Sequence, residues 1–331
     1  MTVVVVGNRI AAVGRAGQVR LPVDAQIVDA TGKYLVPGLL DMHVHLGPWE
    51  MPLLIANGVT GIREMGSDCH PAWSAADCLD EVRTWQRQVE SGQLIGPRLL
   101  ALSGWPVVAR SKWPAKGPRG LAETLPEFFA AASAQQGRQL ARYFAERSVD
   151  FIKITGHLPR DGFLALVDEA RKLGLPVAGH EQLSTSAIEA SAAGMSSFEH
   201  SRVFLFGCFP GAAEFARLGL NEPDTKWRRR MVDEFDSTAC QQVFSAFARN
   251  ATRYVPTHLT RRMDAFADDA AFRNDWRSKY IPKARWKAWN QDADGMIKVD
   301  PSPEGRKAMM DFYRKGLEIT RSAHKAGVKV M

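Results

Sequence analysis

Short apolar runs alternate with amphipathic stretches along most of this chain. Eight runs read as strands: 35–45, 59–65, 98–103, 151–155, 177–180, 197–200, 254–256 and 328–331. Between them lie stretches with the apolar spacing of helices, for example 164–173 and 187–193. Such alternation predicts a parallel sheet built from βα units. Eight such units close into a (β/α)8 barrel of the TIM type, with the active site at the carboxyl ends of its strands.

Two helix-to-strand junctions have the same pattern. ARKLGLPVAGH at 170–180 and SAHKAGVKVM at 322–331 each place a glycine at the end of a helix, directly before a strand. An open, doubly wound sheet is the alternative architecture. It is disfavoured because no GxGxxG or Walker loop opens a βα turn, and because the polar candidates described below all stand at strand ends.

The first 33 residues have a different, all-β character. Runs at 3–6 and 10–13 flank Gly7-Asn8, a pair typical of hairpin turns, and a third run covers 26–28. We therefore expect two domains. Residues 1–33 form a small, partial β-sandwich module, and residues 34–331 form the barrel.

Composition fits a globular enzyme. The chain has 331 residues, of which 45% are hydrophobic and 24% charged, which excludes a disordered protein. No apolar run reaches the roughly 20 residues that span a bilayer, and the opening MTVVVVGNR lacks a signal-peptide pattern. We expect a cytoplasmic protein with no membrane partner.

The net charge and the cysteines indicate no further partner or site. The net charge is +7, but the cations are spread along the chain, and the densest group, 227–230, is explained by a solvated helix face. No nucleic-acid partner is expected, and self-association into a homo-oligomer stays open. The four cysteines form no CxxC pair and are expected to be free thiols; they are Cys69, Cys78, Cys208 and Cys240.

The segment YLVPGLLDMHVHLG at 34–47 carries the strongest chemical signal. In an extended strand alternate side chains share a face, so His43 and His45 point to the same side. Imidazole is the commonest metal ligand at neutral pH, so this pair could bind one divalent ion. The alternative is an ordinary strand with two partly buried histidines.

Three further residues fall at strand ends. In FIKIT at 151–155, Lys153 points into the barrel, where an unpaired ammonium would cost several kcal/mol. It needs either a carboxylate partner or carboxylation by carbon dioxide, which gives an anion able to bridge two cations. His180 and His200 end the next two strands. Placement of all these side chains on the first, fourth, fifth and sixth strands favours a joint metal site.

With these motifs the chain resembles the amidohydrolase superfamily, especially its binuclear imidazolonepropionase-like and Xaa-Pro dipeptidase-like groups. The resemblance rests on VPGLLDMHVHLG, GVTGIREMG, GPRLLALSG, DFIKITG, LPVAGHE and SFEHS. It implies two divalent ions, expected to be zinc, with His43 and His45 on the first and His180 and His200 on the second. Carboxylated Lys153 would bridge them, and a bridging hydroxide would be the nucleophile.

Two departures from the superfamily matter. Its mononuclear deaminase branch uses a His-x-x-Glu arrangement, whereas Glu181, Gln182 and Leu183 follow His180 here. The superfamily also ends its eighth strand in an aspartate that moves a proton, and this chain stops at Met331 before one appears. We expect a sequence truncated in the eighth barrel unit, and hence a poorly stable, nearly inactive polypeptide with no assigned catalytic residue.

Substrate selection is predicted from cations on the loops after strands four, six and seven. His157, Arg160, Arg202 and His258 could reach the pocket mouth, as could Arg261 and Arg262, and would suit a carboxylate-bearing substrate. The leading hypothesis is hydrolysis of an amide C–N bond in a small peptide-like or N-acyl amino acid substrate. The alternatives are hydrolysis of a cyclic amide and a non-catalytic barrel or inactive fragment.

Overall fold

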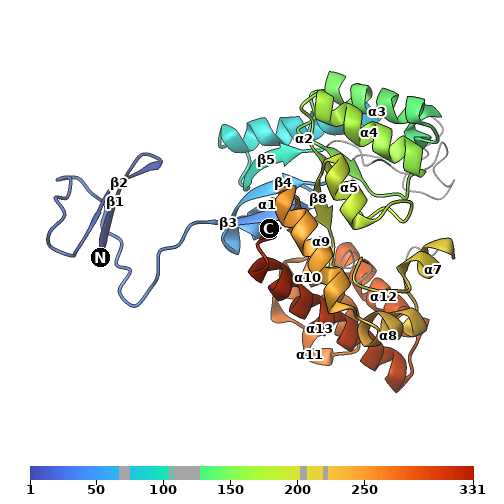
Figure 1. Ribbon diagram of the computed structural model, residues 1–331. Helices are drawn as coiled ribbons and strands as arrows, with labels where there is room; N and C mark the ends of the chain where they lie inside the picture. Colours follow the sequence, from blue (N-terminus) through green and yellow to red (C-terminus); the bar gives the residue numbers. More distant parts are fainter. Residues whose placement is uncertain (67–74, 104–106, 108–126, 202–206, 219–222) are drawn as a thin grey trace. The chain divides into compact units, whose positions relative to one another are not determined.

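The computed structural model describes residues 1–66, 75–103, 107, 127–201, 207–218 and 223–331 (Figure 1). The chain divides into two compact units, Met1–Pro37 and Gly38–Met331. The described part contains no helix long and apolar enough to cross a membrane. Each unit is described by itself.

The first unit is built on one antiparallel hairpin. Strand β1 (Thr2–Val6) pairs with β2 (Arg9–Gly14), and Gly7 takes the positive φ of 60° that the tight turn needs. The strand expected at 26–28 is absent from the structure. Ile27 and Val28 are 79% and 78% exposed, and no strand within the described residues pairs with them, so nothing fixes an extended ladder there. A β-sandwich module stays a prediction.

The second unit contains all eight of the predicted strands. They are β3 (Leu39–Val44), β4 (Val59–Glu64), β5 (Arg98–Leu102), β6 (Ile152–Ile154), β7 (Val177–Gly179), β8 (Met195–Glu199), β9 (Arg253–Val255) and β10 (Lys329–Val330). Every neighbouring pair is parallel, in the orders β3-β4-β5 and β10-β9-β8-β7-β6. Neighbours follow one another along the chain without the reversal of a doubly wound sheet, which favours the barrel order.

The two parallel sheets meet between β5 and β6. Asp150 N donates to Leu102 O at 2.9 Å, and Leu102 N donates to the Asp150 carboxylate at 2.9 Å. Val107 bridges to Ile154 in parallel register. No ladder between β10 and β3 is present in the described residues, so closure of the barrel stays a prediction.

Helices alternate with the strands, as predicted, and the expected helices at 164–173 and 187–193 correspond to α4 and α5. The set is α1 (Met51–Ala56), α2 (Ala75–Glu90), α3 (Ala134–Glu146), α4 (Arg160–Lys172), α5 (Ala187–Ala193), α7 (Ala212–Arg217), α8 (Thr225–Asp233), α9 (Ser237–Arg249), α10 (His258–Ala265), α11 (Ala270–Arg273), α12 (Lys283–Val299) and α13 (Pro303–Lys325), with 3-10 turns η2 (Glu127–Ala130) and η3 (Trp276–Tyr280). Figure 1 shows α3 and α4 side by side.

Strand β8 shows how the core positions polar groups. Phe198 is fully buried and stacks on Phe247 of α9, with ring centroids 4.8 Å apart. Because side chains alternate along a strand, the residues on either side of Phe198 face away from α9. Ser197 and Glu199 are nevertheless almost completely buried, so two polar groups are enclosed on the opposite face of the sheet.

The expectation of free thiols is wrong for two cysteines. Cys208 and Cys240 form a disulfide that joins the segment after β8 to α9, across 32 positions of sequence. Asp236 N donates to Cys208 O at 2.8 Å, which holds this segment beside the start of the helix. Short sequence spacing cannot reveal such a pair, because tertiary packing brings it together. Cys69 and the side chain of Cys78 lie outside the described residues.

Candidate metal centre

Four predicted ligands gather at the carboxyl ends of three strands. His43 lies in β3 and His45 directly follows it, His180 follows β7, and His200 follows β8. Ring centroids are 5.3 Å apart for His43 and His45, 4.8 Å for His43 and His200, and 4.7 Å for His180 and His200. The structure thus brings all four imidazoles into one cluster.

Backbone geometry at the strand ends fixes two of these histidines. Gly179 has φ 146°, and a Cβ there would lie 2.1 Å from Ile154 O, so only glycine lets β7 approach β6 this closely before His180. His200 takes a left-handed φ of 73° while its N donates to Val255 O at 2.8 Å. Such a conformation costs a non-glycine residue free energy and is concentrated at functional sites.

The histidine rings are oriented through their Nδ1 atoms. His45 Nδ1 lies 2.7 Å from Gly66 O, and because a carbonyl only accepts, Nδ1 carries the proton and Nε2 the lone pair. His43 Nδ1 lies 2.7 Å from Glu199 Oε2, and His200 Nδ1 lies 2.6 Å from Thr257 Oγ1. Metal-binding histidines are characteristically held in this way through the nitrogen that does not bind the ion.

The protonation state of His43 also suits a metal ligand. Burial lowers its pKa from 6.5 to about 4, against the opposing effect of its hydrogen bond to Glu199. The imidazole is therefore neutral at neutral pH, the form that binds metal ions. His180 and His200 contact one another directly, with their Nε2 atoms 3.0 Å apart.

Lys153 is the most unusual group of the cluster. Its side chain is completely buried, and Nζ has no hydrogen-bond partner within the described structure. Burial lowers its pKa from 10.5 to about 8, while Glu199 and Glu64 act in the opposite direction and Arg63 adds to the lowering. Nζ thus makes no hydrogen bond to a carboxylate in the described residues, although the charges of Glu199 and Glu64 act on it.

The residues present fit a divalent metal pair. The donor set combines four imidazoles, of which that of His43 is neutral, with a buried amine that lacks a hydrogen bond, and carboxylation would turn that amine into a two-oxygen ligand. In the described residues, no three His, Cys, Asp or Glu side chains already have the geometry to hold one ion. The fit therefore rests on the chemistry of the donors.

A buried network that the sequence did not predict supports His43. Arg63, in β4, donates from Nη2 to Glu199 Oε1 at 2.7 Å, from Nη1 to Ser197 Oγ at 3.0 Å and from Nε to Met42 O at 2.7 Å. Burial tends to raise the pKa of Glu199, but the His43 hydrogen bond and the Arg63 charge outweigh it, so the pKa is lowered. Glu199 is therefore ionised.

Glu199 stands in the motif SFEHS directly before His200, but the alternation of side chains along a strand argued against a role for both residues in one site. Placing His200 on the inner face of an ideal strand puts Glu199 on the outer face. The left-handed backbone at His200 breaks the alternation and lets both side chains contribute to the cluster. Arg63 stands beside Glu64 at the end of strand β4, and this charged pair within a strand was the signal that the sequence offered.

Three of the predicted substrate contacts have hydrogen-bond or ion-pair partners in the structure. Arg160 forms an ion pair with Glu189 of α5, His157 Nδ1 lies 3.4 Å from Leu183 N, and His258 Nε2 lies 2.9 Å from Thr320 Oγ1. Arg202 lies outside the described residues. Their roles in substrate binding stay predictions.

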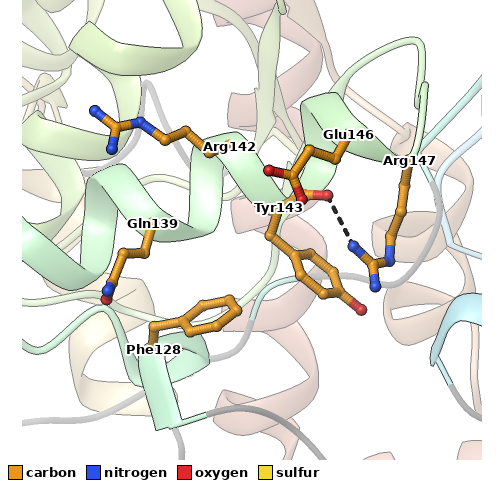
Figure 2. A pocket seen from close by; sticks show the side chains of 6 residues that line it. All are labelled: Phe128, Gln139, Arg142, Tyr143, Glu146 and Arg147. Carbon is orange, nitrogen blue, oxygen red and sulfur yellow. Dashed lines mark hydrogen bonds between the residues drawn. The ribbon is translucent and has the colours of Figure 1, made fainter.

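A hollow elsewhere in this unit contains none of the predicted site residues. It has a volume of about 450 Å³ and is lined by Phe128, Gln139, Arg142, Tyr143, Glu146 and Arg147. Figure 2 shows these side chains around η2 and α3, with Arg147 extended alongside Tyr143. The Arg147 guanidinium lies 3.5 Å from the centroid of the Tyr143 ring, a cation–π contact. None of the four clustered histidines lines this hollow, so it is a different site from the histidine cluster.

Comparison with known proteins identifies the fold. No family model and no curated protein sequence matches the chain. Among solved structures it is similar to bottromycin amidohydrolase, with a TM-score of 0.56 and 17% identity over 89% of this chain and 57% of that one. For a Bifidobacterium longum protein assigned as a prolidase, the TM-score is 0.54 and the identity 20%, over 97% of this chain and 65% of that one. For a further amidohydrolase, the TM-score is 0.52 and the identity 19%, over 95% of this chain and 68% of that one.

These structural neighbours are amidohydrolase-superfamily enzymes. At such identities the likeness shows the fold, an α/β structure with the parallel sheets of amidohydrolase TIM barrels. The chain spans 57% of the length of bottromycin amidohydrolase and 65% of the Bifidobacterium protein.

Proposed function

We propose that this chain provides the metal centre of a hydrolase that cleaves an amide C–N bond in a small peptide-like or N-acyl amino acid substrate. His43 and His45 would hold one divalent ion and His180 and His200 a second, zinc in each case. Carboxylated Lys153 would lie between them. The observation that carries the proposal is the buried Lys153 amine, without a hydrogen bond and close enough to His43 to lower its pKa, together with the cluster of four histidines to which His43 belongs.

Charge balance favours carboxylation of this lysine. In that reaction the neutral amine forms an N–C bond to carbon dioxide and releases a proton, which leaves a carbamate anion. A buried anion needs cations around it, and the neutral His43 ring supplies none. Divalent ions would supply positive charge beside the carbamate, while Glu199 already has the Arg63 guanidinium as its partner.

Bound ions would lower the pKa of a water molecule and polarise the amide carbonyl. The residues of this chain would hold the imidazoles in place, with His43, His180 and His200 partly buried and His45 exposed. Among the predicted substrate contacts, Arg160 is half-exposed and already paired with Glu189. A substrate carboxylate would therefore compete with Glu189 for this guanidinium. No nucleic-acid or membrane partner is part of the proposal, and the oligomeric state is left open.

The test combines metal analysis, lysine labelling and a substrate panel. We expect about two zinc ions per chain, a carbamate carbon signal after incubation with ¹³C-labelled bicarbonate, and hydrolysis of dipeptides or N-acyl amino acids. Lys153→Met should lose the carbamate signal and the metal. Lys172→Met, which removes an exposed lysine paired with Asp168, is the matched control and should keep both.

Each result has a clear meaning. A well-folded chain with neither metal nor carbamate would refute the hydrolase and leave a non-catalytic barrel. Metal and carbamate with selective hydrolysis of ring amides would replace the linear substrate class by cyclic amides.

A further inference from the structure

We infer that Arg63 is a positioning residue that acts through Glu199 to keep the proton of His43 on Nδ1, so that the lone pair is on Nε2. The inference rests on the proposed metal site and extends it to residues that contact no ion. It assigns Arg63 and Glu199 a task beyond stabilising the fold, namely control of the His43 tautomer.

The donors of Arg63 tie three strands together. Its guanidinium extends from β4 to Met42 O in β3 and to Ser197 and Glu199 in β8. Met42 directly precedes His43, so the same side chain holds the backbone beside His43 and the carboxylate that contacts its ring. Arg63 is only 8% exposed, so solvent does not replace these contacts.

Both oxygens of Glu199 are used. Oε1 accepts from Arg63 Nη2 at 2.7 Å and from Ser197 Oγ at 2.6 Å, while Oε2 lies 2.7 Å from His43 Nδ1. An ionised carboxylate only accepts hydrogen bonds, so Nδ1 of His43 must carry the proton. The lone pair is then on Nε2, the nitrogen that remains to bind an ion.

An amide at position 199 would disrupt this assignment. If its oxygen faces His43, its NH2 group must face Arg63, which places donor against donor in a buried site. If the amide is turned over, its NH2 group faces Nδ1 and stabilises the tautomer with the proton on Nε2. Glu199→Gln therefore either leaves the Arg63 guanidinium without its acceptor or gives His43 the wrong tautomer.

If Arg63 and Glu199 formed only a structural ion pair, a different result would be expected. Removing one partner of a buried pair destabilises the fold in either case. Only a positioning role also changes the proton location on His43 in protein that is still folded. The tautomer is therefore the decisive measurement.

The experiment compares wild type, Glu199→Gln, Arg63→Lys and Arg142→Met. Arg142 and Glu169 form the control pair, with the same 2.7 Å separation but an arginine side chain that is 58% exposed. Ring ¹⁵N shifts of His43 are measured in metal-free protein. Zinc affinity is measured by competition with a chelator, and circular dichroism checks that each variant is folded.

In wild type and Arg142→Met we expect His43 protonated on Nδ1. Glu199→Gln should shift the proton to Nε2 in a large share of molecules and lower zinc affinity roughly 10- to 100-fold. Arg63→Lys, whose ammonium cannot reproduce the planar fork, should do the same to a smaller extent. If Glu199→Gln does not fold, Arg63→Lys decides the question.

An unchanged His43 tautomer and zinc affinity in the folded variants would overturn the inference. Failure of the proposed function is distinguishable from this outcome. A wild-type chain that takes up no zinc would refute the metal site, whereas the tautomer of metal-free protein would still report whether Arg63 and Glu199 position His43.

Discussion

Replacing Lys153 by methionine should stabilise the metal-free protein, although it removes a proposed metal ligand. The Lys153 ammonium is fully buried and has no hydrogen bond in the described structure. Methionine is similar in size and carries no charge, so it removes the desolvation cost and fills the same space. Stability and metal binding should therefore change in opposite directions.

The magnitude follows from the pKa of Lys153, which burial lowers from 10.5 to about 8. Each pKa unit corresponds to about 1.4 kcal/mol, so the charged form costs the folded state roughly 3 kcal/mol. The unfolded state binds more protons than the folded state between the two pKa values, so wild-type stability rises with pH in that window. The advantage of the variant should therefore shrink by about 1.4 kcal/mol between about pH 7 and about pH 9.

The assay is chemical denaturation of chelator-treated protein in buffer free of carbon dioxide, so that Lys153 is neither bound to metal nor carboxylated. Groups that do not interact with Lys153 titrate equally in both proteins and cancel in the difference. His43 and Glu199 do interact with Lys153, but both titrate well below pH 7 and so do not affect this window. Lys172→Met again serves as the control and should show no such gain. A Lys153→Met variant that is less stable than wild type at neutral pH, or whose difference is independent of pH, would refute the reasoning.

Three further results are expected. Reduction of Cys208–Cys240, or serine at both positions, should lower the free energy of unfolding by roughly 3–4 kcal/mol because the closed loop is long, as thermal melts with and without reductant will measure. Gly179→Ala should cost at least about 3 kcal/mol in denaturation, because its Cβ would collide with Ile154 O; an unaffected midpoint would contradict this close approach. Burial lowers the pKa of His258, so its folded form resists protonation and stability falls as pH drops below 6.5. His258→Gln should flatten that part of the stability profile relative to wild type.

The sequence predicted the strands well because their apolar runs are bounded by glycines and polar residues. Parallel pairing in sequence order followed from the alternation of strands with helices. The run at 26–28 failed because an apolar pattern shows that a segment can pair, whereas a strand also needs a partner edge. The Cys208–Cys240 bond was missed for a related reason, since it depends on the path of the segment after β8.

The histidines of the candidate site could be found because each stands at or next to a strand end, and because the period-two alternation of side chains puts His43 and His45 on one face. Their supporting groups could not, because they depend on contacts between strands that are far apart in sequence and on one departure from that alternation. Glu199 reaches His43 across 156 positions, and His200 has a backbone conformation that no strand pattern predicts.

The dependence of the histidines on these supporting groups has a chemical consequence. Histidines alone define a place where a metal could bind, but each ring has two nitrogens and its tautomer decides which of them can donate electrons. In this fold Glu199 and Gly66 O make that choice for His43 and His45, whereas the Thr257 hydroxyl, which can donate or accept, contacts Nδ1 of His200. Two of these partners are neutral and one is a buried carboxylate held by Arg63. Since an anionic partner raises the basicity of the ring more than a neutral one, His43 should be the strongest donor of the three, and loss of Glu199 should weaken metal binding more than loss of the Thr257 hydroxyl.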